Sequence, residues 1–405
     1  MRELKGTSKL NIKLSNRSQI LKFLRCQGPC ARSGISKNLA LTQAGVSLLI
    51  AEMLEEGVLW ETCEDECRNK PGKNGMLVDI HYGNFYTLGC HVGDTHVYSG
   101  LADIKGRIQY TAQPRIFDPS QPYSILEKVN ASIQDTLSHT GQVPIGVGLG
   151  INNELFRKFL PELQLNVFLR DGVKNEYPDV SVIVDIASRQ LALAQIDFGM
   201  TPDMDNMLFL QVANSLDMSM TIHGELWNGA HGNMGWLDHV VIDPNGELCE
   251  CGKRGCVKTV MTIEGILGRA RKVYSKETTP VLYRVTEGNP NRLEYDHLKI
   301  ASRGGDKPIM RIYERDDSLF FSLLQNLLTL FDPEKCVVQG IGLYANEFVE
   351  RLNQQAEKTF GEQFGKAYEL SFINEKNIFL GGNAAAGRRF FYEAAACFRG
   401  AAAFL

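Results

Sequence analysis

A histidine and three cysteines crowd into one short run near the middle of the chain, and they constrain its local fold more than any other feature. The run extends from His239 to Cys256 and reads HVVIDPNGELCECGKRGC. Imidazole and thiolate are ligands that Zn²⁺ prefers, and four of them close a tetrahedral structural site. We therefore predict a structural Zn²⁺ ion with the ligands His239, Cys249, Cys251 and Cys256. The alternative is one histidine and three unrelated core cysteines.

Glycines in the same run make a single metal site sterically feasible. The tight Cys249-Glu250-Cys251 stretch lets a turning backbone offer two sulfur atoms to one ion. Gly252 and Gly255 permit the sharp loop that returns Cys256 to the same point. Because four protein ligands leave no position for a catalytic water, the predicted role of the metal is structural.

The length and composition indicate an ordinary soluble protein with more than one domain. The 405 residues suffice for two or three domains, and the chain is 44% hydrophobic and 22% charged. No secretory signal and no apolar run long enough to span a membrane is present in the sequence. We therefore expect a cytoplasmic protein with reduced thiols and without membrane insertion.

Charge is distributed unevenly along the chain. The net charge is −4, but residues 1–40 contain nine Lys and Arg residues against a single acid, Glu3. A basic end on an acidic body is typical of a DNA-binding head attached to a sensor domain. A solvated N-terminal tail would show the same charge pattern.

The pattern of apolar residues over 16–61 predicts three helices followed by a strand. The first helix carries Ile20 and Leu24 and ends at Gly28-Pro29, and the second carries Ile35. The third begins after Thr42, a good N-cap residue, and its apolar face is formed by Val46, Leu49, Ile50, Met53 and Leu54. Strands at 58–61 and 76–82 would form a wing. Residues 1–80 are therefore predicted to be a winged helix-turn-helix domain.

The third helix of such a domain enters the major groove of double-stranded operator DNA. This one has no Arg or Lys on its exposed face, although Gln43 could read adenine. The residues predicted to contact DNA, through bases or phosphates, are Arg17, Arg32, Lys37, Thr42, Gln43, Ser47, Lys70 and Lys73. A three-helix packing module that touches no DNA is the alternative.

The rest of the chain alternates strands and helices, which favours an α/β fold. Strands are predicted at 145–151, 181–186, 335–342 and 377–382, and the last two end in glycine. Helices are predicted at 124–138, 188–199, 316–330, 345–359 and after 382.

The metal run and the head both resemble the ROK family of sugar kinases and sugar-responsive repressors. The family pattern G-x-x-G-x-A-G-E-x-G-H, ten residues and then C-x-C-G-x-x-G-C-L-E, is here GAHGNMGWLDH from Gly229 and CECGKRGCVK from Cys249. The resemblance implies a two-lobed, actin-like ATPase fold behind the winged head. Lobe 1 is then expected at 81–195, with a C-terminal helix at 383–405 packing back, and lobe 2 at 196–382, with the metal loop and an oligomerisation surface.

The chain departs from the family at the positions that a kinase needs. The family phosphate loop G-x-D-x-G-G-T is here GCHVGDT, so that Asp94 brings negative charge where phosphate would bind. The family carboxylate that deprotonates the sugar hydroxyl is replaced by Ala187, which cannot accept a proton. The resemblance therefore implies a body that is not an enzyme.

The sugar-binding positions are also altered. The Glu of the family's G-E-x-G-H segment is Trp236, which either stacks on a sugar or, as we favour, fills the cavity. The remaining candidate ligand-binding residues are Asn152, Asn153 and Glu154.

The function that these observations favour is a transcriptional regulator, a repressor of carbohydrate uptake or metabolism genes similar to ROK repressors of the glucose and N-acetylglucosamine type. Its expected partners are operator DNA, further copies of itself in a dimer or tetramer, and a sugar or sugar-phosphate effector. The main alternative is a diverged regulator that binds DNA weakly and acts by contact with a phosphotransferase protein or a related repressor. A sugar kinase is the third and least favoured reading.

Overall fold

The computed structural model describes residues 9–62, 76–159, 162–199, 205–212, 215–232, 234–340 and 345–395, with the backbone alone at 345–348. The chain forms two compact units, residues 1–203 with 375–405, and residues 204–374. These limits fall at 203/204 and 374/375, whereas the sequence analysis predicted lobe boundaries at 195/196 and 382/383. The predicted head and lobe 1 fall within the same unit.

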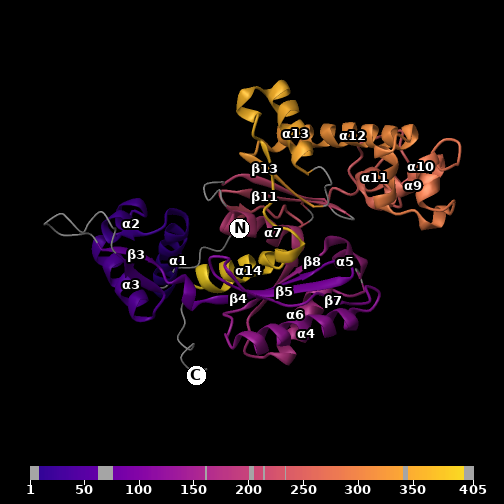
Figure 1. The fold of residues 1–405 in the computed structure, drawn as a ribbon. Helices are drawn as coiled ribbons and strands as arrows, with labels where there is room; N and C mark the ends of the chain where they lie inside the picture. The colour runs from indigo at the N-terminus through magenta and orange to yellow at the C-terminus, as the bar shows by residue number, and fades with distance from the viewer. Residues whose placement is uncertain are drawn as a thin grey trace. The chain divides into compact units, whose positions relative to one another are not determined.

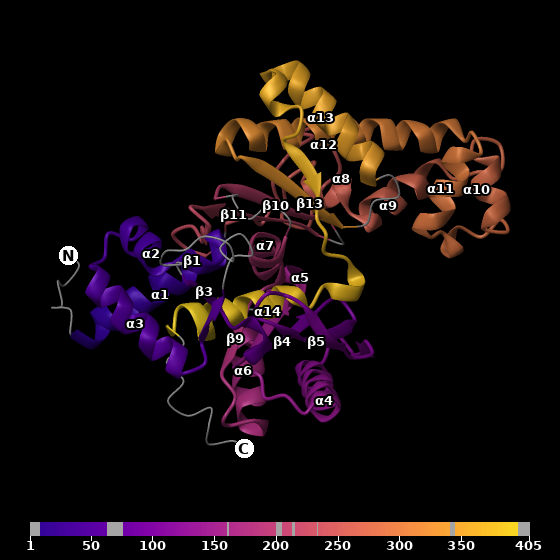
Figure 2. The same cartoon turned by 60° about the vertical axis from the view of Figure 1, so that its left-hand side comes forward.

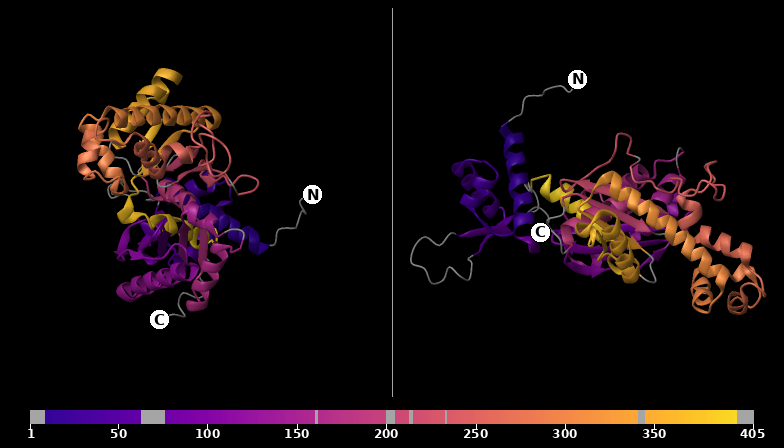
Figure 3. Two further views of the ribbon diagram at one scale, coloured as in Figure 1. Left: turned by 90° about the vertical axis from the view of Figure 1, so that its right-hand side faces the viewer. Right: turned by 90° about the horizontal axis from the view of Figure 1, so that it is seen from above.

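The head has the element order of a winged helix-turn-helix, as predicted. Its elements are α1 (Lys9–Gln27), β1 (Cys30–Ala31), α2 (Arg32–Asn38), α3 (Gln43–Glu55), β2 (Leu59–Thr62) and β3 (Leu77–Ile80). The strands form an antiparallel sheet in the order β1-β3-β2, in which the two-residue strand β1 was not predicted. Figure 3 shows the helices and this sheet from two directions. Thr42 caps α3 as predicted, accepting a hydrogen bond from the Gly45 amide at 3.2 Å.

The core of the head includes residues from distant parts of the chain. Ile20, Leu24, Ile35 and Ile50 are fully buried, which confirms the helical pattern. Phe391 and Tyr392, close to the other end of the sequence, belong to the same cluster. The head therefore completes its core with the C-terminal segment of its own unit.

The body of the first unit is a sheet covered by helices. Its strands are β4 (Tyr86–Val92), β5 (His96–Asp103), β6 (Ile108–Thr111), β7 (Arg115–Ile116), β8 (Val147–Ile151) and β9 (Val182–Ile186). Its helical elements are η2 (Tyr82–Asn84), α4 (Pro122–Thr140), α5 (Asn153–Lys158), α6 (Leu165–Glu176), α7 (Ala187–Phe198), η5 (Glu375–Asn377), α14 (Leu380–Gly387) and the π-helical turn η6 (Arg388–Tyr392). The strand order is β6-β5-β4-β8-β9, with β7 beside β5.

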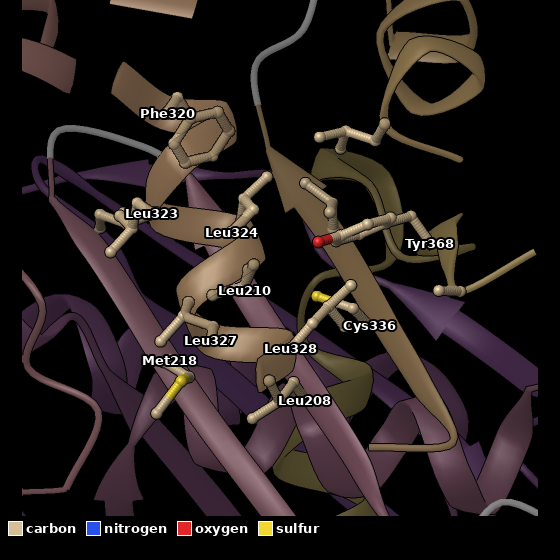
Figure 4. Packing of buried hydrophobic residues seen from close by; sticks show 14 of the residues in the cluster. Leu208, Leu210, Met218, Phe320, Leu323, Leu324, Leu327, Leu328, Cys336 and Tyr368 are labelled. Carbon is tan, nitrogen blue, oxygen red and sulfur yellow. The ribbon is translucent and has the colours of Figure 1, made fainter. Parts of the chain in front are cut away.

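The second unit contains a sheet and a separate helical cluster. The strands are β10 (Met207–Val212), β11 (Leu216–Ile222), β12 (Glu225–Leu226), β13 (Lys335–Gly340) and β14 (Tyr368–Leu370). The helices are α8 (Val257–Met261), α9 (Ile263–Val273), α10 (Pro280–Val285), η3 (Pro290–Arg292), α11 (Tyr295–Arg303), α12 (Lys307–Phe331), α13 (Ala345–Phe360) and η4 (Glu362–Phe364). Leu324 and Leu328 of α12 pack over the strands (Figure 4). The sequence analysis assigned no elements to α9–α11, which have a core of their own.

The two large sheets share one topology. The second is ordered β12-β11-β10-β13-β14, which repeats the order of the first sheet position by position. In both, the first two strands form an antiparallel hairpin, and the two later strands join it in parallel. This duplication is the arrangement expected of an actin-like ATPase fold.

The strand predicted at 377–382 is wrong, because α14 begins at Leu380. The glycines of this segment allow helix α14 to approach the sheet closely. A Cβ atom on Gly148 of β8 would lie 2.0 Å from the Gly382 carbonyl oxygen, and one on Gly382 would lie 2.3 Å from the Gly148 oxygen. Figures 1 and 2 both show α14, in yellow, lying along β4. The predicted helix at 383–405 is described only as far as Ala395, and α14 itself ends at Gly387.

A buried ion cluster joins the head to the body of the first unit. The Asp197 carboxylate, in the last turn of α7, lies 3.0 Å from a guanidinium nitrogen of Arg25 in α1. It also accepts two hydrogen bonds from Arg388 of η6, at 2.7 and 2.8 Å. The Arg25 guanidinium lies 5.0 Å from the centre of the Tyr392 ring. Burial alone would raise the pKa of Asp197, but the two arginines hold it below its ordinary value.

We expect Asp197→Asn to destabilise the first unit by about 3–5 kcal/mol, because two buried guanidinium groups lose their counter-charge. The measurement is chemical denaturation of the purified full chain. Since the pKa of Asp197 is lowered, its contribution is complete above the ordinary value of 3.8 and is lost as the pH falls through the folded-state pKa. The difference between the two proteins should therefore be constant from pH 5 to 8.

The matched control is Asp171→Asn on α6, whose side chain is 55% exposed beside Arg170. It should change stability by no more than about 0.5 kcal/mol. Equal stabilities for Asp197→Asn and the control would contradict a structural role for the cluster.

Candidate functional site

The histidine and the three cysteines of the predicted metal run converge in the second unit, in the loop between β12 and α8. One ligand atom from each of His239, Cys249, Cys251 and Cys256 lies within 4.8 Å of all the others. The His239 Nδ1 and Cys249 Sγ atoms are 3.5 Å apart, and the Cys251 and Cys256 Sγ atoms are 3.6 Å apart. Within the described parts of the chain, no other group of His, Cys, Asp and Glu residues converges in this way.

These separations fit a tetrahedral metal ion. Metal–nitrogen bonds of about 2.0 Å and metal–sulfur bonds of about 2.3 Å give ligand–ligand edges of roughly 3.5–3.8 Å. The measured 3.5 and 3.6 Å lie in that range. Two of the ligand–ligand separations therefore match a tetrahedral site, and the others are no longer than 4.8 Å.

The loop geometry depends on two glycines with positive φ. Gly252 has φ +85° and closes a turn in which its amide donates to the Cys249 carbonyl at 2.9 Å. Gly255 has φ +64°, and a Cβ atom there would lie 1.5 Å from the carbonyl oxygen of Asp243. Position 255 needs a positive φ and leaves no room for a Cβ atom, and only glycine meets both requirements. Gly255 therefore permits the chain to return to Cys256.

The thiols differ in environment. Cys249 and Cys256 are buried, whereas Cys251 is exposed. Burial raises the pKa of Cys256 to about 12, and the Lys253 backbone amide lowers that of Cys251. A metal that bound these cysteines as thiolates would therefore displace protons from them.

Trp236 connects the metal loop to the sheet of the same unit. Its ring meets the His239 ring edge-on, with the centroids 4.7 Å apart. Its indole N–H donates to Asp238 at 3.4 Å, and the other Asp238 oxygen accepts from the Leu216 amide of β11 at 2.9 Å. The residue that replaces a family carboxylate thus supports the predicted metal ligand.

The remaining candidate ligand residues lie at the start of α5 in the first unit, and their polar groups are engaged locally. Asn152 donates to Asp94 at 2.7 Å and accepts from the Glu154 amide at 2.8 Å, which caps the helix. Asn153 is buried, and its oxygen accepts from Arg157 at 3.1 Å. Glu154 is exposed.

The position that the family pattern assigns to the catalytic base carries no carboxylate. Ala187 is the first residue of α7 and is buried. The nearby Asp185 pairs with Arg189 at 3.2 Å, and burial raises its pKa. In the former phosphate loop, burial lowers the pKa of His91 to about 4, so this side chain is neutral at physiological pH.

The residues predicted to contact DNA differ in their exposure to solvent and in their side-chain partners. Lys37 and Gln43 are exposed, Ser47 is half-buried, and the exposed Thr42 uses its hydroxyl to cap α3. Arg32 pairs with Glu61 of β2 at 2.7 Å. Lys70 and Lys73 lie outside the described residues.

The prediction that Arg17 contacts DNA is wrong. Its side chain is only 2% exposed and donates to Glu56 and to the Ala395 carbonyl. The residue holds α1, the end of α3 and the C-terminal segment together. The sequence analysis did not identify Leu48 as a contact, although it lies on the exposed side of α3 with 63% of its surface accessible.

Through the described ranges, every helix is too short or too polar to span a lipid bilayer.

Comparisons with known proteins identify the family of the chain. The family model described as "ROK family" matches residues 87–378. The chain is 23% identical over 385 residues to a xylose repressor of Caldicellulosiruptor bescii, covering 91% of this chain and 94% of the repressor. It is 28% identical over 260 residues to a glucokinase of Thermotoga maritima, covering 62% of this chain and 81% of the kinase.

A solved structure has the same fold over nearly the whole chain. It is a ROK family transcriptional regulator described as a homologue of the Escherichia coli Mlc protein. The TM-score is 0.71 at 20% identity, with 95% of this chain and 98% of that chain covered. Because the family model spans well over half of the sequence, this chain belongs to the ROK family.

Proposed function

We propose that this protein is a DNA-binding transcriptional regulator that represses genes of carbohydrate uptake or metabolism. The observation that carries the proposal is the extent of the similarity. The xylose repressor match covers 91% of the chain, too much to leave out the whole winged head, whereas the glucokinase match covers only 62%. A winged helix-turn-helix attached to a sugar-kinase-like body suits a regulator that couples a sugar signal to DNA.

The body is proposed to lack kinase activity. Ala187 supplies no proton acceptor, and Asp185, two residues before it in the sequence, is paired with Arg189. Asp94 adds negative charge at the former phosphate loop and is itself held by Asn152. These substitutions remove both the general base and a favourable phosphate environment.

The metal is proposed to be Zn²⁺ in a structural role, on the ligand set and separations of His239, Cys249, Cys251 and Cys256. It would stiffen the loop that supports oligomerisation, as a dimer or a tetramer. A sugar or sugar-phosphate effector is the expected small-molecule partner, with Asn152, Asn153 and Glu154 of the first unit as the candidate ligand-binding residues. The protein would act in the cytoplasm.

A second candidate is a diverged regulator that acts by contact with a phosphotransferase protein or a related repressor. The observation in its favour is that α3 has no Arg or Lys and that Arg17 and Arg32 are tied to glutamates. Weak binding to DNA would follow from both.

A selection from a random duplex library at moderate salt tests the leading proposal. We expect enrichment of a palindromic motif, because a symmetric oligomer presents two heads to two half-sites. Moderate salt suppresses non-specific binding through phosphates. The absence of any enriched motif, with folded protein, would favour the protein-contact candidate.

Elemental analysis tests the metal. We expect about one Zn²⁺ per chain, and Cys251→Ser should lose most of it, because one of four ligands is removed. The loss should lower thermal stability and weaken oligomerisation. Cys26→Ser, at an exposed cysteine outside the cluster, is the matched control and should keep the metal. Unchanged metal content and unchanged oligomer in Cys251→Ser would refute the assignment.

A coupled assay for ATP consumption tests the absence of kinase activity. We expect no sugar-dependent turnover with glucose, xylose or N-acetylglucosamine, because no base is available at position 187. A ROK glucokinase run in parallel shows that the assay responds. Sugar-dependent ATP turnover by the purified chain would overturn this part of the proposal.

A further inference from the structure

The exposed side of α3 carries an apolar stripe over its first three turns. Ala44, Leu48 and Ala51 are exposed and lie at i, i+4 and i+7, which places them on one face of the helix. Leu48 is 63% exposed.

The stripe is not needed to fold the head. The opposite side of α3 supplies the core through Val46, Leu49, Ile50 and Met53, all buried. One exposed leucine on a surface requires no explanation. Here, however, it lies centrally on the helix that a winged helix-turn-helix domain inserts into the major groove, and two alanines flank it at helical spacing.

The surrounding charge favours DNA as the occupant of this face. The first turn of α3 has no acidic residue. The positive end of the helix dipole lies at that turn. Exposed Lys37, in the last turn of α2, lies just before it in the chain.

Acidic residues gather at the opposite end of α3 and are mostly neutralised. Glu52 pairs with Lys13 at 2.6 Å, and Glu56 pairs with Arg17. Glu55 is exposed in the last turn, where a phosphate would be repelled. The N-terminal turns of α3 are therefore the part of the helix suited to approach a polyanion.

The side chains in those turns determine which bases can be read. Guanine presents two acceptors in the major groove, which an Arg or Lys would satisfy and Leu48 cannot. Thymine is the standard base that presents an apolar group there, the C5-methyl group. We propose that Leu48, flanked by Ala44 and Ala51, binds thymine methyl groups of the operator, with Gln43 and Ser47 making the polar contacts beside them.

This inference rests on the proposed function and gives it a base preference. 5-Methylcytosine carries the same methyl group, so the selection uses a synthetic library without modified bases. Any methyl group that the protein recognises in the selected duplex then belongs to thymine.

The test replaces each thymine of the selected duplex by deoxyuridine, one at a time, and measures Kd at fixed salt. The exchange removes only the methyl group and leaves the base pairing intact. At one or two positions in each half-site we expect affinity to fall about five- to tenfold. The Leu48→Ala substitution should weaken binding to the thymine duplex by a similar factor. The variant protein should bind the thymine and the deoxyuridine duplexes with equal affinity. Because Leu48 is outside the core, this variant should fold normally.

Leu10→Ala is the matched control, because Leu10 of α1 is 62% exposed and lies outside α3. It should retain the preference for thymine over uracil. Equal affinity of the original protein for both duplexes at every position would overturn the inference while leaving the repressor proposal intact. A preference that persists in Leu48→Ala would overturn the role of Leu48. Failure to select any duplex would remove the proposed function itself.

Discussion

The arrangement of the first unit depends on one buried carboxylate. Asp197 contacts Arg25 and Arg388, two guanidinium groups from opposite ends of the chain. Removing such groups from water is costly, and the cost is offset only when their mutual geometry is good. The cluster therefore restricts the position of α1 relative to α7 and η6. The head is positioned by a specific electrostatic contact as well as by the apolar packing around Phe391.

The helix that carries this carboxylate also reaches the former catalytic position. α7 begins with Ala187 and holds Asp197 in its last turn, and nine of its twelve residues are buried. A helix of that length extends about 18 Å and behaves as a rigid element. In a kinase of this family the same helix would begin at the catalytic base. In this chain the helix begins at Ala187, and its last turn anchors the head through Asp197, so that it connects two regions of the unit.

Local patterns were predictable from the sequence and long-range contacts were not. The convergence of the four candidate metal ligands and the three head helices both follow from spacing and periodicity within about twenty residues. The sequence predicts that Arg17 contacts DNA, whereas the structure buries it against Glu56 and Ala395. Both partners are distant in the sequence, and helical periodicity cannot show that they lie beside Arg17. The pair Gly381-Gly382 predicts the end of a strand, but in the structure it lies in helix α14. There Gly382 permits close contact with Gly148 of the sheet. Helices α9–α11 were not predicted, although α9 buries Ile266 and Ala270 and α11 buries Leu298 and Ala301 at helical spacing.

The head uses much of its positive charge to hold itself together. Of the nine basic residues in 1–40, Lys13, Arg17, Arg25 and Arg32 form ion pairs with carboxylates. A guanidinium group buried against Asp197 or Glu56 cannot also neutralise a phosphate without breaking the fold. The charge count of the sequence therefore overstates the attraction for DNA. A head with fewer available charges must draw more of its specificity from shape and apolar contact, and the exposed stripe on α3 offers that contact.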